Sequence, residues 1–408
     1  MSAPQKREPL VATLLGGLLL ATNAAFAGGP LNVRDTGDPY VWSTMPIAYR
    51  TDNGPLSAAV TEAQARSRVA AMFSVWQSVA TSNVAYARAG FISDTGVFTD
   101  GDVSTVPEYN AVEADCINGV QSPIIYDADA TIIIDLGLDE TAILGFAGQC
   151  LFNDVAPFQI VSGDAVMNGL FQDGVDSTAN PEVSAALFDA AFVHEFGHFS
   201  GLDHSQVNVN CLGFCGADDL EGVPTMFPIL IDQSMGTLSD DDKAWISRLY
   251  PAATFTTTYG TITGTVFFSD GQSHAQFVNV IARRVDTGLN EDRRNAVSVS
   301  SGFRARVLRG NPIDDPTGAS SGSAAAADIG YFEIPVPAGS YTIEVEGIDP
   351  SFTAGSSIGG WPYDSPIGMP GTAPAPIGPI VVAAGATVSG NDITLIGTDP
   401  RFDQFEGP

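Results

Sequence analysis

Three of the four histidines in this 408-residue chain lie within one short string, HEFGHFSGLDH. They are His194, His198 and His204, and the same string holds Glu195 and Gly201. The spacing, H-E-x-x-H-x-x-G-x-x-H, constrains the fold more than any other feature, because three imidazole rings placed in this way can converge on one metal ion. The string therefore predicts a metal site and the local backbone that must build it.

The first two histidines are predicted to lie on one helix. His194 and His198 are four residues apart, so on a helix they face the same side, one turn from each other. Asn180 is a favourable N-cap residue and Pro181 suits the first helical position. We therefore expect the helix to begin at these two residues.

The remaining residues of the string indicate a catalytic site. Gly201 is expected to end the helix, because glycine adopts a positive φ without a Cβ penalty and lets the chain return His204 as the third ligand. A catalytic zinc takes three protein ligands and leaves the fourth position to water. Glu195 lies beside the ligand face, where its carboxylate can take a proton as water attacks a carbonyl. A structural zinc site would be closed by a fourth protein ligand, so zinc-dependent hydrolysis is the leading hypothesis.

On these residues the chain resembles the metzincin metalloproteases, and among them the matrixin (matrix metalloproteinase) family. Ser205 follows the last histidine as it does in matrixins, and residues 224–228, with Met226, look like the matrixin Met-turn beneath the metal. Residues 238–242 resemble the start of the family's C-terminal helix, and residues 46–50 resemble its first strand.

The resemblance covers residues 40–251 and implies a fold. It implies a metzincin catalytic domain of mixed α+β or α/β class, with a twisted five-stranded sheet, three helices and a substrate cleft above the zinc. Residues 160–169 are expected to be the edge strand of that cleft, so that an extended substrate would pair with part of 161–168. An apolar stripe at helical spacing is expected to mark the first long helix: Val69, Met72, Phe73, Trp76, Val79 and Ala80.

Three departures from matrixins limit what the resemblance implies. No cysteine precedes Cys116, so we expect the cysteine-based latency of matrixins to be absent. No histidine precedes His194, so we expect their second, structural zinc to be absent as well. The connection from the last histidine to the Met-turn is longer than in matrixins and contains Cys211 and Cys215, so substrate preference does not carry over.

The first residues predict export from the cell. Lys6 and Arg7 precede an apolar run over 10–20 and a stretch of small residues, a pattern typical of a signal peptide over 1–27 that is cleaved before Gly28. A membrane anchor is the alternative, but glycines interrupt the run and it is short for a bilayer span. We therefore expect a secreted or periplasmic protein.

The four cysteines suit an oxidising compartment, because their number is even. Of the three pairings, we favour Cys116 with Cys150 and Cys211 with Cys215. Free buried thiols or zinc ligands are the alternative.

The formal net charge of −30 argues against a nucleic-acid partner. Most of the acidic residues precede position 255, and solubility is one explanation for them. Calcium (Ca²⁺) is the other, because it takes oxygen ligands, but no stretch matches an EF-hand loop and we name no calcium ligand. Arginines gather between 283 and 309, either as a solvated face or as a docking patch for an acidic partner.

A second domain is expected after Pro251. Short β-branched and aromatic runs, separated by glycine and proline, predict strands over 259–268, 276–282, 330–336, 340–346, 380–382 and 387–395. The phrases GTVF, GYFEIP and PAGSYTI resemble the carboxypeptidase regulatory-like β-sandwich that follows many secreted bacterial hydrolases. We therefore expect a catalytic domain over 28–255, an all-β sandwich over 256–398 and a tail over 399–408.

The sequence thus predicts a secreted zinc endopeptidase that acts on proteins or peptides. The alternative is a secreted adhesion or matrix-binding protein that keeps an inactive zinc-binding scaffold, although such a scaffold has no chemical use for Glu195. Because every site residue precedes position 227, a chain ending near Ala253 is expected to fold and to cleave short peptides. The predicted roles are metal ligands for His194, His198 and His204, general base and acid for Glu195, Met-turn support for Met226 and helix-ending turn for Gly201.

Overall fold

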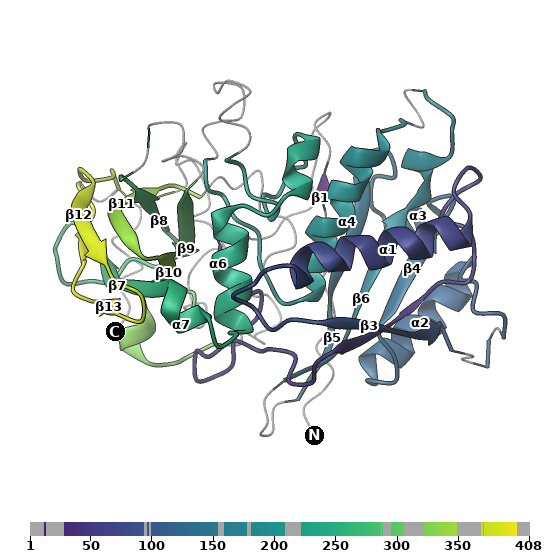
Figure 1. Ribbon diagram of the computed structural model, residues 1–408, viewed down its shortest axis with the longest axis horizontal. Coiled ribbons are helices and arrows are strands. Elements are labelled where there is room, and N and C mark those ends of the chain that lie inside the picture. The colour runs from purple at the N-terminus through teal and green to yellow at the C-terminus, as the bar shows by residue number, and fades with distance from the viewer. Residues whose placement is uncertain are drawn as a thin grey trace.

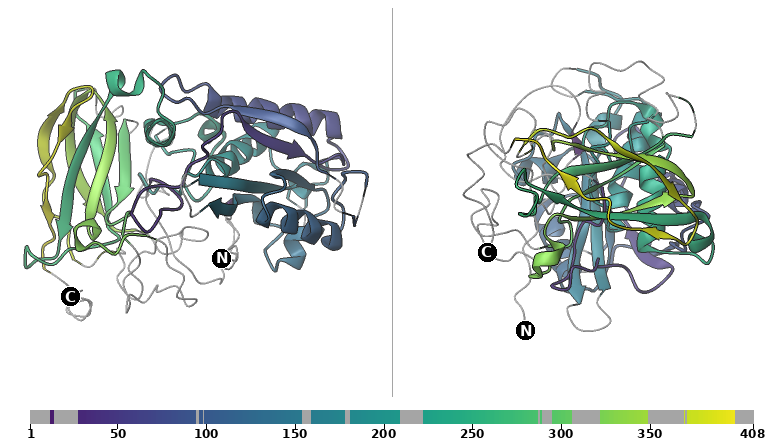
Figure 2. Two further views of the ribbon diagram at one scale, coloured as in Figure 1. Left: turned by 90° about the horizontal axis from the view of Figure 1, so that it is seen from below. Right: turned by 90° about the vertical axis from the view of Figure 1, so that its left-hand side faces the viewer.

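The computed structural model describes residues 12–13, 28–93, 96–97, 99–153, 159–177, 181–208, 222–286, 288, 295–305, 322–348, 369 and 371–397. The rest of the expected signal peptide, the tail over 399–408 and the Cys211–Cys215 pairing lie outside these residues. An α/β part and a β-sandwich part lie side by side, with helix α6 (Asp240–Leu249) between them (Figures 1 and 2).

The α/β part is built on one mixed sheet whose strands follow the order β1-β5-β6-β4-β2-β3. Strands β2, β3, β4 and β6 are parallel, and β5 runs antiparallel beside β6. Five strands lie after position 46, and β1 adds a sixth from within the expected signal peptide. The strands are β1 (Ala12–Thr13), β2 (Ile47–Thr51), β3 (Tyr86–Phe91), β4 (Pro123–Asp127), β5 (Ile143–Asn153) and β6 (Gln159–Asn168).

Helices cover both faces of this sheet (Figure 2). Helices α1 (Glu62–Gln77) and α4 (Ala185–Phe199) share one hydrophobic core, and α2 (Val106–Ile117) and α3 (Thr131–Asp135) share another. Strand β4 serves both cores, because successive side chains of a strand point to opposite faces. Ile124 and Tyr126 lie in the first core and Ile125 in the second. Helices α2 and α3 are additional to the three helices that the resemblance implies.

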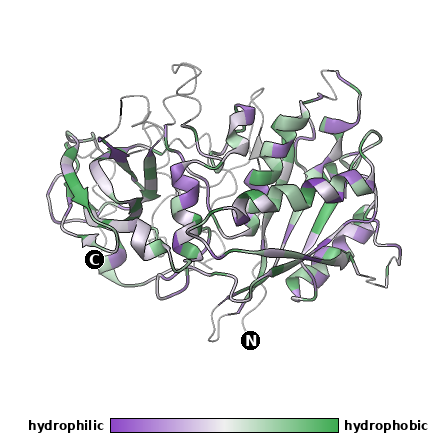
Figure 3. Cartoon of the chain, in the orientation of Figure 1, coloured by the Kyte–Doolittle hydropathy of each residue, from purple (hydrophilic) through white to green (hydrophobic). Residues whose placement is uncertain are grey.

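Helix α1 forms because its apolar residues recur on one face. The buried residues are Ala65, Val69, Phe73 and Trp76, which follow helical spacing. At its start, the Gln64 side chain accepts a hydrogen bond from the Thr61 backbone N–H at 2.9 Å. Hydrophilic and hydrophobic residues alternate along the helix in Figure 3. The helix ends at Gln77, before the last residues of the predicted stripe.

The prediction of an edge strand over 160–169 is wrong. Strand β6 lies inside the sheet, where it pairs with β5 along most of its length and with β4 over Ala165–Asn168. Its backbone groups there are already engaged, so they are not open to a substrate. Strand β5 lies farther out, and only the two residues of β1 pair with its outer side among the described residues.

The C-terminal part consists of two sheets. One has the order β10-β7-β13, with β14 also paired to β7, and the other has the order β12-β11-β8-β9. A short helix, α7 (Phe255–Thr258), leads into the first strand. The strands are β7 (Tyr259–Phe267), β8 (Asn279–Arg284), β9 (Ala296–Ser300), β10 (Tyr331–Pro337), β11 (Gly339–Glu346), β12 (Ile377–Val382), β13 (Thr387–Val388) and β14 (Ile393–Thr394).

Strand β9 has no counterpart among the predicted strands, and it lies where the two parts meet. Helix α6 covers it: the Trp245 indole N–H donates to the Ser298 carbonyl at 2.7 Å, and the Asp241 carboxylate accepts the Ser298 backbone N–H at 2.6 Å. On β10, Glu333 pairs with Arg248 of α6 at 2.6 Å. One hydrophobic core runs through both parts. A chain ending near Ala253 would lack the sandwich and would expose Trp245. These contacts therefore argue against the expectation that such a chain folds by itself.

We predict that the two parts unfold together. Trp245→Ala should lower the free energy of unfolding by about 3–5 kcal/mol, since it removes a large buried side chain at the junction. Urea unfolding followed by circular dichroism measures this change. A single transition shifted to lower urea is expected, whereas a variant whose sandwich unfolds at an unchanged urea concentration would contradict a shared core.

Candidate metal centre

Helix α4 carries the first two histidines and begins later than the sequence predicts. Its N-cap is Ser184, whose hydroxyl accepts the Leu187 backbone N–H at 3.1 Å. Pro181 precedes the helix, and Asn180 lies outside the described residues. The Val183 backbone N–H donates to the Phe171 carbonyl at 3.1 Å, which ties this segment to the preceding element instead of to the helix. A contact between segments this far apart is not visible in the sequence pattern.

Helix α4 ends at Phe199 with a Schellman turn around Gly201. Gly201 has a φ of +97°, and its N–H donates to the His198 carbonyl at 2.9 Å. The Leu202 N–H donates to the Gly197 carbonyl at 3.0 Å, which completes the motif. The chain therefore leaves the helix sharply and returns His204 toward it.

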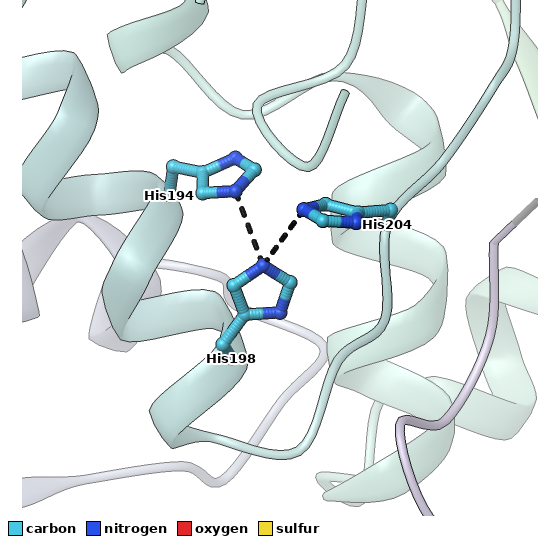
Figure 4. Close-up of side chains that lie close together, drawn as sticks. All are labelled: His194, His198 and His204. Carbon is cyan, nitrogen blue, oxygen red and sulfur yellow. Dashed lines mark hydrogen bonds between the residues drawn. The ribbon is translucent and has the colours of Figure 1, made fainter. Parts of the chain in front are cut away.

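The three histidine side chains point toward one another (Figure 4). The Nε2 atom of His198 lies 3.1 Å from Nε2 of His194 and 3.1 Å from Nε2 of His204. Tetrahedral ligands at zinc–nitrogen distances of ~2.0–2.1 Å are separated by about 3.3 Å. The observed spacing is close to that value, so the three Nε2 atoms can share one ion.

Hydrogen bonds fix the orientation of the first two rings. Nδ1 of His194 donates to the Thr225 carbonyl at 2.7 Å, and Nδ1 of His198 donates to the Leu202 carbonyl at 2.8 Å. A carbonyl only accepts, so each Nδ1 carries the hydrogen and each Nε2 keeps its lone pair. Burial lowers the pKa of His194 to about 4. Burial and the neighbouring histidines hold the pKa values of His198 and His204 well below the usual range.

Neutral rings with converging lone pairs repel one another unless a cation lies between them. The carboxylate of Glu195 would also be stabilised by a nearby cation. Its side chain is fully buried, and neither carboxylate oxygen has a hydrogen-bond partner among the described residues. Burial raises its pKa well above the usual range, because a charged carboxylate is costly there. The donor set and the buried carboxylate both fit a bound metal ion.

A second group of ligand atoms lies close together in the described residues, at Glu113, Cys150 and Asp164. Its sulfur is not available as a thiolate, because Cys150 forms a disulfide with Cys116. The pairing of these two cysteines is the one that the sequence analysis favours, and it is confirmed. The histidine group is therefore the stronger candidate for a metal site.

Met226 lies in a tight turn that packs against helix α4. The Phe227 N–H donates to the Pro224 carbonyl at 3.1 Å, which closes the turn, and Met226 is only 2% exposed. A Cβ atom added to Gly197 would lie 2.1 Å from the Met226 sulfur. Gly197 lies between the two helical histidines, so its missing side chain lets Met226 pack directly against the helix. The H-E-x-x-H motif allows any residue at position 197, so the sequence did not predict a role for Gly197.

Asp242 holds the same turn from α6. Its carboxylate accepts the backbone N–H groups of Thr225 at 2.9 Å and Met226 at 3.1 Å. It also accepts the Ser239 backbone N–H at 2.7 Å, which forms part of a capping box at the start of α6. Because the Thr225 carbonyl orients His194, Asp242 supports a histidine that it does not touch. The sequence predicts only that residues 238–242 begin a helix.

No protein-family model and no curated protein matches this chain. The part of the chain described by the structure contains no helix with both the length and the apolar character to cross a membrane.

The arginines that gather between 283 and 309 in the sequence are partly described. Arg283, Arg284 and Arg304 each pair with a carboxylate. The other four lie outside the described residues.

We predict that Asp242→Asn weakens both the fold and the metal centre. An amide offers one acceptor oxygen in place of two, so a buried N–H of the turn loses its partner at a cost of about 1–3 kcal/mol. Metal affinity should fall about 10-fold, as for other groups that orient ligands indirectly. Urea unfolding and a chelator competition measure the two effects.

The matched control is Asp240→Asn, which removes the same charge from the same helical turn. The hydrogen bonds from the Thr225 and Met226 backbone N–H groups go to Asp242 and not to Asp240. Equal losses in both variants would mean that only helix capping had changed.

Proposed function

We propose that the protein is an exported zinc-dependent endopeptidase. The observation that carries the proposal is the convergence of three neutral imidazole nitrogens beside Glu195, a buried carboxylate that has no hydrogen-bond partner among the described residues. The Cys116–Cys150 disulfide is in keeping with export to an oxidising compartment. The signal-peptide pattern over 1–27 supports the same location.

Zinc would be held by the Nε2 atoms of His194, His198 and His204. Three neutral nitrogen ligands suit zinc, and the absence of a fourth protein ligand in the described group leaves room for water. When bound, zinc would acidify a water molecule and polarise the carbonyl group of a substrate.

Glu195 would move the protons of the reaction. Its carboxylate takes a proton from the attacking water while the water oxygen bonds to the peptide carbonyl carbon. It then delivers a proton to the amide nitrogen as the carbon–nitrogen bond breaks, so the products are a carboxylic acid and an amine.

A peptide substrate would lie along strand β5. This strand contacts helix α4 and is at the edge of the five strands that follow position 46. In β1, Ala12 and Thr13 pair antiparallel with Gly145 and Ile143, so the outer side of β5 accepts an added strand. Backbone hydrogen bonds to such an edge position a substrate largely independently of its side chains.

The alternative function is that of an adhesion protein with an inactive metal scaffold. The burial of Glu195 argues against it, because a scaffold would gain stability from a neutral residue at this position. The same experiment on Glu195 separates the two functions.

We predict that Glu195→Gln keeps the metal and loses the reaction. The amide is nearly the same size but cannot accept a proton, so peptide hydrolysis should fall by several orders of magnitude. His204→Ala should lose metal as well as activity. Metal analysis and cleavage of a peptide library, read by mass spectrometry with and without a chelator, measure both. Cleavage by Glu195→Gln at the parental rate would contradict the proposed mechanism.

We also predict that a non-cleavable peptide slows amide hydrogen exchange in β5. The Glu195→Gln variant allows the complex to be studied without turnover. Protection should appear between Ile143 and Gln149 and be absent from β3, the far edge of the sheet. Protection at β3 instead would place the substrate elsewhere.

A further inference from the structure

The segment that follows the third histidine is buried between the α/β part and the sandwich. Residues 205–208 are at most 1% exposed, although they belong to no helix or strand. On the side of the metal centre, the Ser205 N–H donates to the Met226 carbonyl at 2.8 Å, and the His204 carbonyl accepts the Gly28 N–H at 2.7 Å. The other side of the segment faces the sandwich.

The sandwich contacts this segment residue by residue. The Ser205 hydroxyl lies 3.3 Å from the Ser298 hydroxyl, and Val207 packs with Ile281 and Ala296 in a small apolar cluster. The Gln206 carbonyl accepts a longer hydrogen bond, 3.4 Å, from the Asn279 side chain. Strands β8 and β9 thus line the segment.

The strongest contact is at the end of the segment. Nη1 of Arg283 donates to Oδ1 of Asn208 at 2.6 Å. Arg283 is held in turn by ion pairs with Glu344 and with Glu346 on the neighbouring strand β11. Asn208 has a φ of +63°, and its side-chain amide donates to the Gly222 carbonyl at 3.1 Å. A charged group on strand β8 therefore holds the side chain of a residue whose backbone is in the left-handed conformation.

We propose that the sandwich positions His204, with Arg283 and Asn279 as positioning residues. His194 and His198 are fixed to each other by α4, whereas His204 lies on an irregular segment whose course depends on its contacts. Loss of groups that orient metal ligands typically lowers metal affinity 10–100-fold. The proposal requires a metal at the histidines, as the proposed function does, but it does not require hydrolysis.

The test uses the full-length protein and Zn²⁺ as the probe. Asn208→Gly removes the side chain that Arg283 holds, keeps a residue that tolerates the positive φ, and leaves the ion pairs of Arg283 in place. Arg283→Ala removes the same contact from the other side. The matched control is Arg284→Ala: Arg284 neighbours Arg283 on β8 but pairs with Asp286 at 2.6 Å.

Two readouts separate positioning from general destabilisation. Chelator competition gives the Zn²⁺ dissociation constant, and the visible spectrum of the Co²⁺-loaded protein reports ligand geometry. We expect a dissociation constant about 10-fold higher and an altered Co²⁺ spectrum for Asn208→Gly and Arg283→Ala, with neither change in Arg284→Ala. Hydrogen exchange of residues 205–208 in the metal-free protein should be faster in the first two variants only.

An unchanged Zn²⁺ constant and spectrum in folded Asn208→Gly would overturn the proposal, even if the segment exchanged faster. An equal effect of Arg284→Ala would overturn it too, since the cause would then be loss of stability in the sandwich. A parental protein that binds Zn²⁺ but cleaves no peptide would contradict the proposed function alone, because these readouts do not use hydrolysis.

Discussion

The structure depends on holding three imidazole nitrogens close enough together for their lone pairs to meet at one metal position, about 2.0–2.1 Å from each nitrogen. His198 lies 3.1 Å from both of the other ring nitrogens, and burial keeps all three rings neutral. Without a cation these lone pairs repel one another, and the adjacent Glu195 carboxylate has no hydrogen-bond partner in the part of the chain that the structure describes. The surrounding protein must therefore supply the free energy that holds the arrangement together, and a bound metal returns part of it.

That support comes from three directions. Helix α4 sets the distance between two of the rings, and its glycine-terminated turn brings back the third. Helix α6 reaches the first histidine through Asp242 and the Thr225 carbonyl. The sandwich borders the segment after the third histidine. The three histidines thus lie near the junction of the two parts, through which one hydrophobic core passes.

The features that could be predicted from sequence are those set by local spacing. The i, i+4 histidines, the helix-ending Gly201 and the helix start over 238–242 depend on residues near them in the chain, so local spacing is enough to predict them. The Cys116–Cys150 pairing was also favoured correctly.

The features that could not be predicted depend on contacts between distant segments. Strand order places β5 and not β6 outermost among the strands that follow position 46, and the periodicity of a strand does not predict its place in the sheet. Helix α4 begins at Ser184 because Val183 bonds to Phe171. Strand β9 alternates valine with serine, and Ser298 is buried because α6 and the segment after His204 contact it. The roles of Gly197 and Asp242 likewise become visible only when the turn at Met226 is in place.

The most direct test of a three-histidine catalytic zinc is the X-ray absorption spectrum of the purified protein at the zinc edge. The account predicts one zinc per chain, with three nitrogen ligands at ~2.0–2.1 Å and one further oxygen ligand from water. A protein without zinc would contradict the account. So would a closed shell in which sulfur or a fourth protein nitrogen replaces the water.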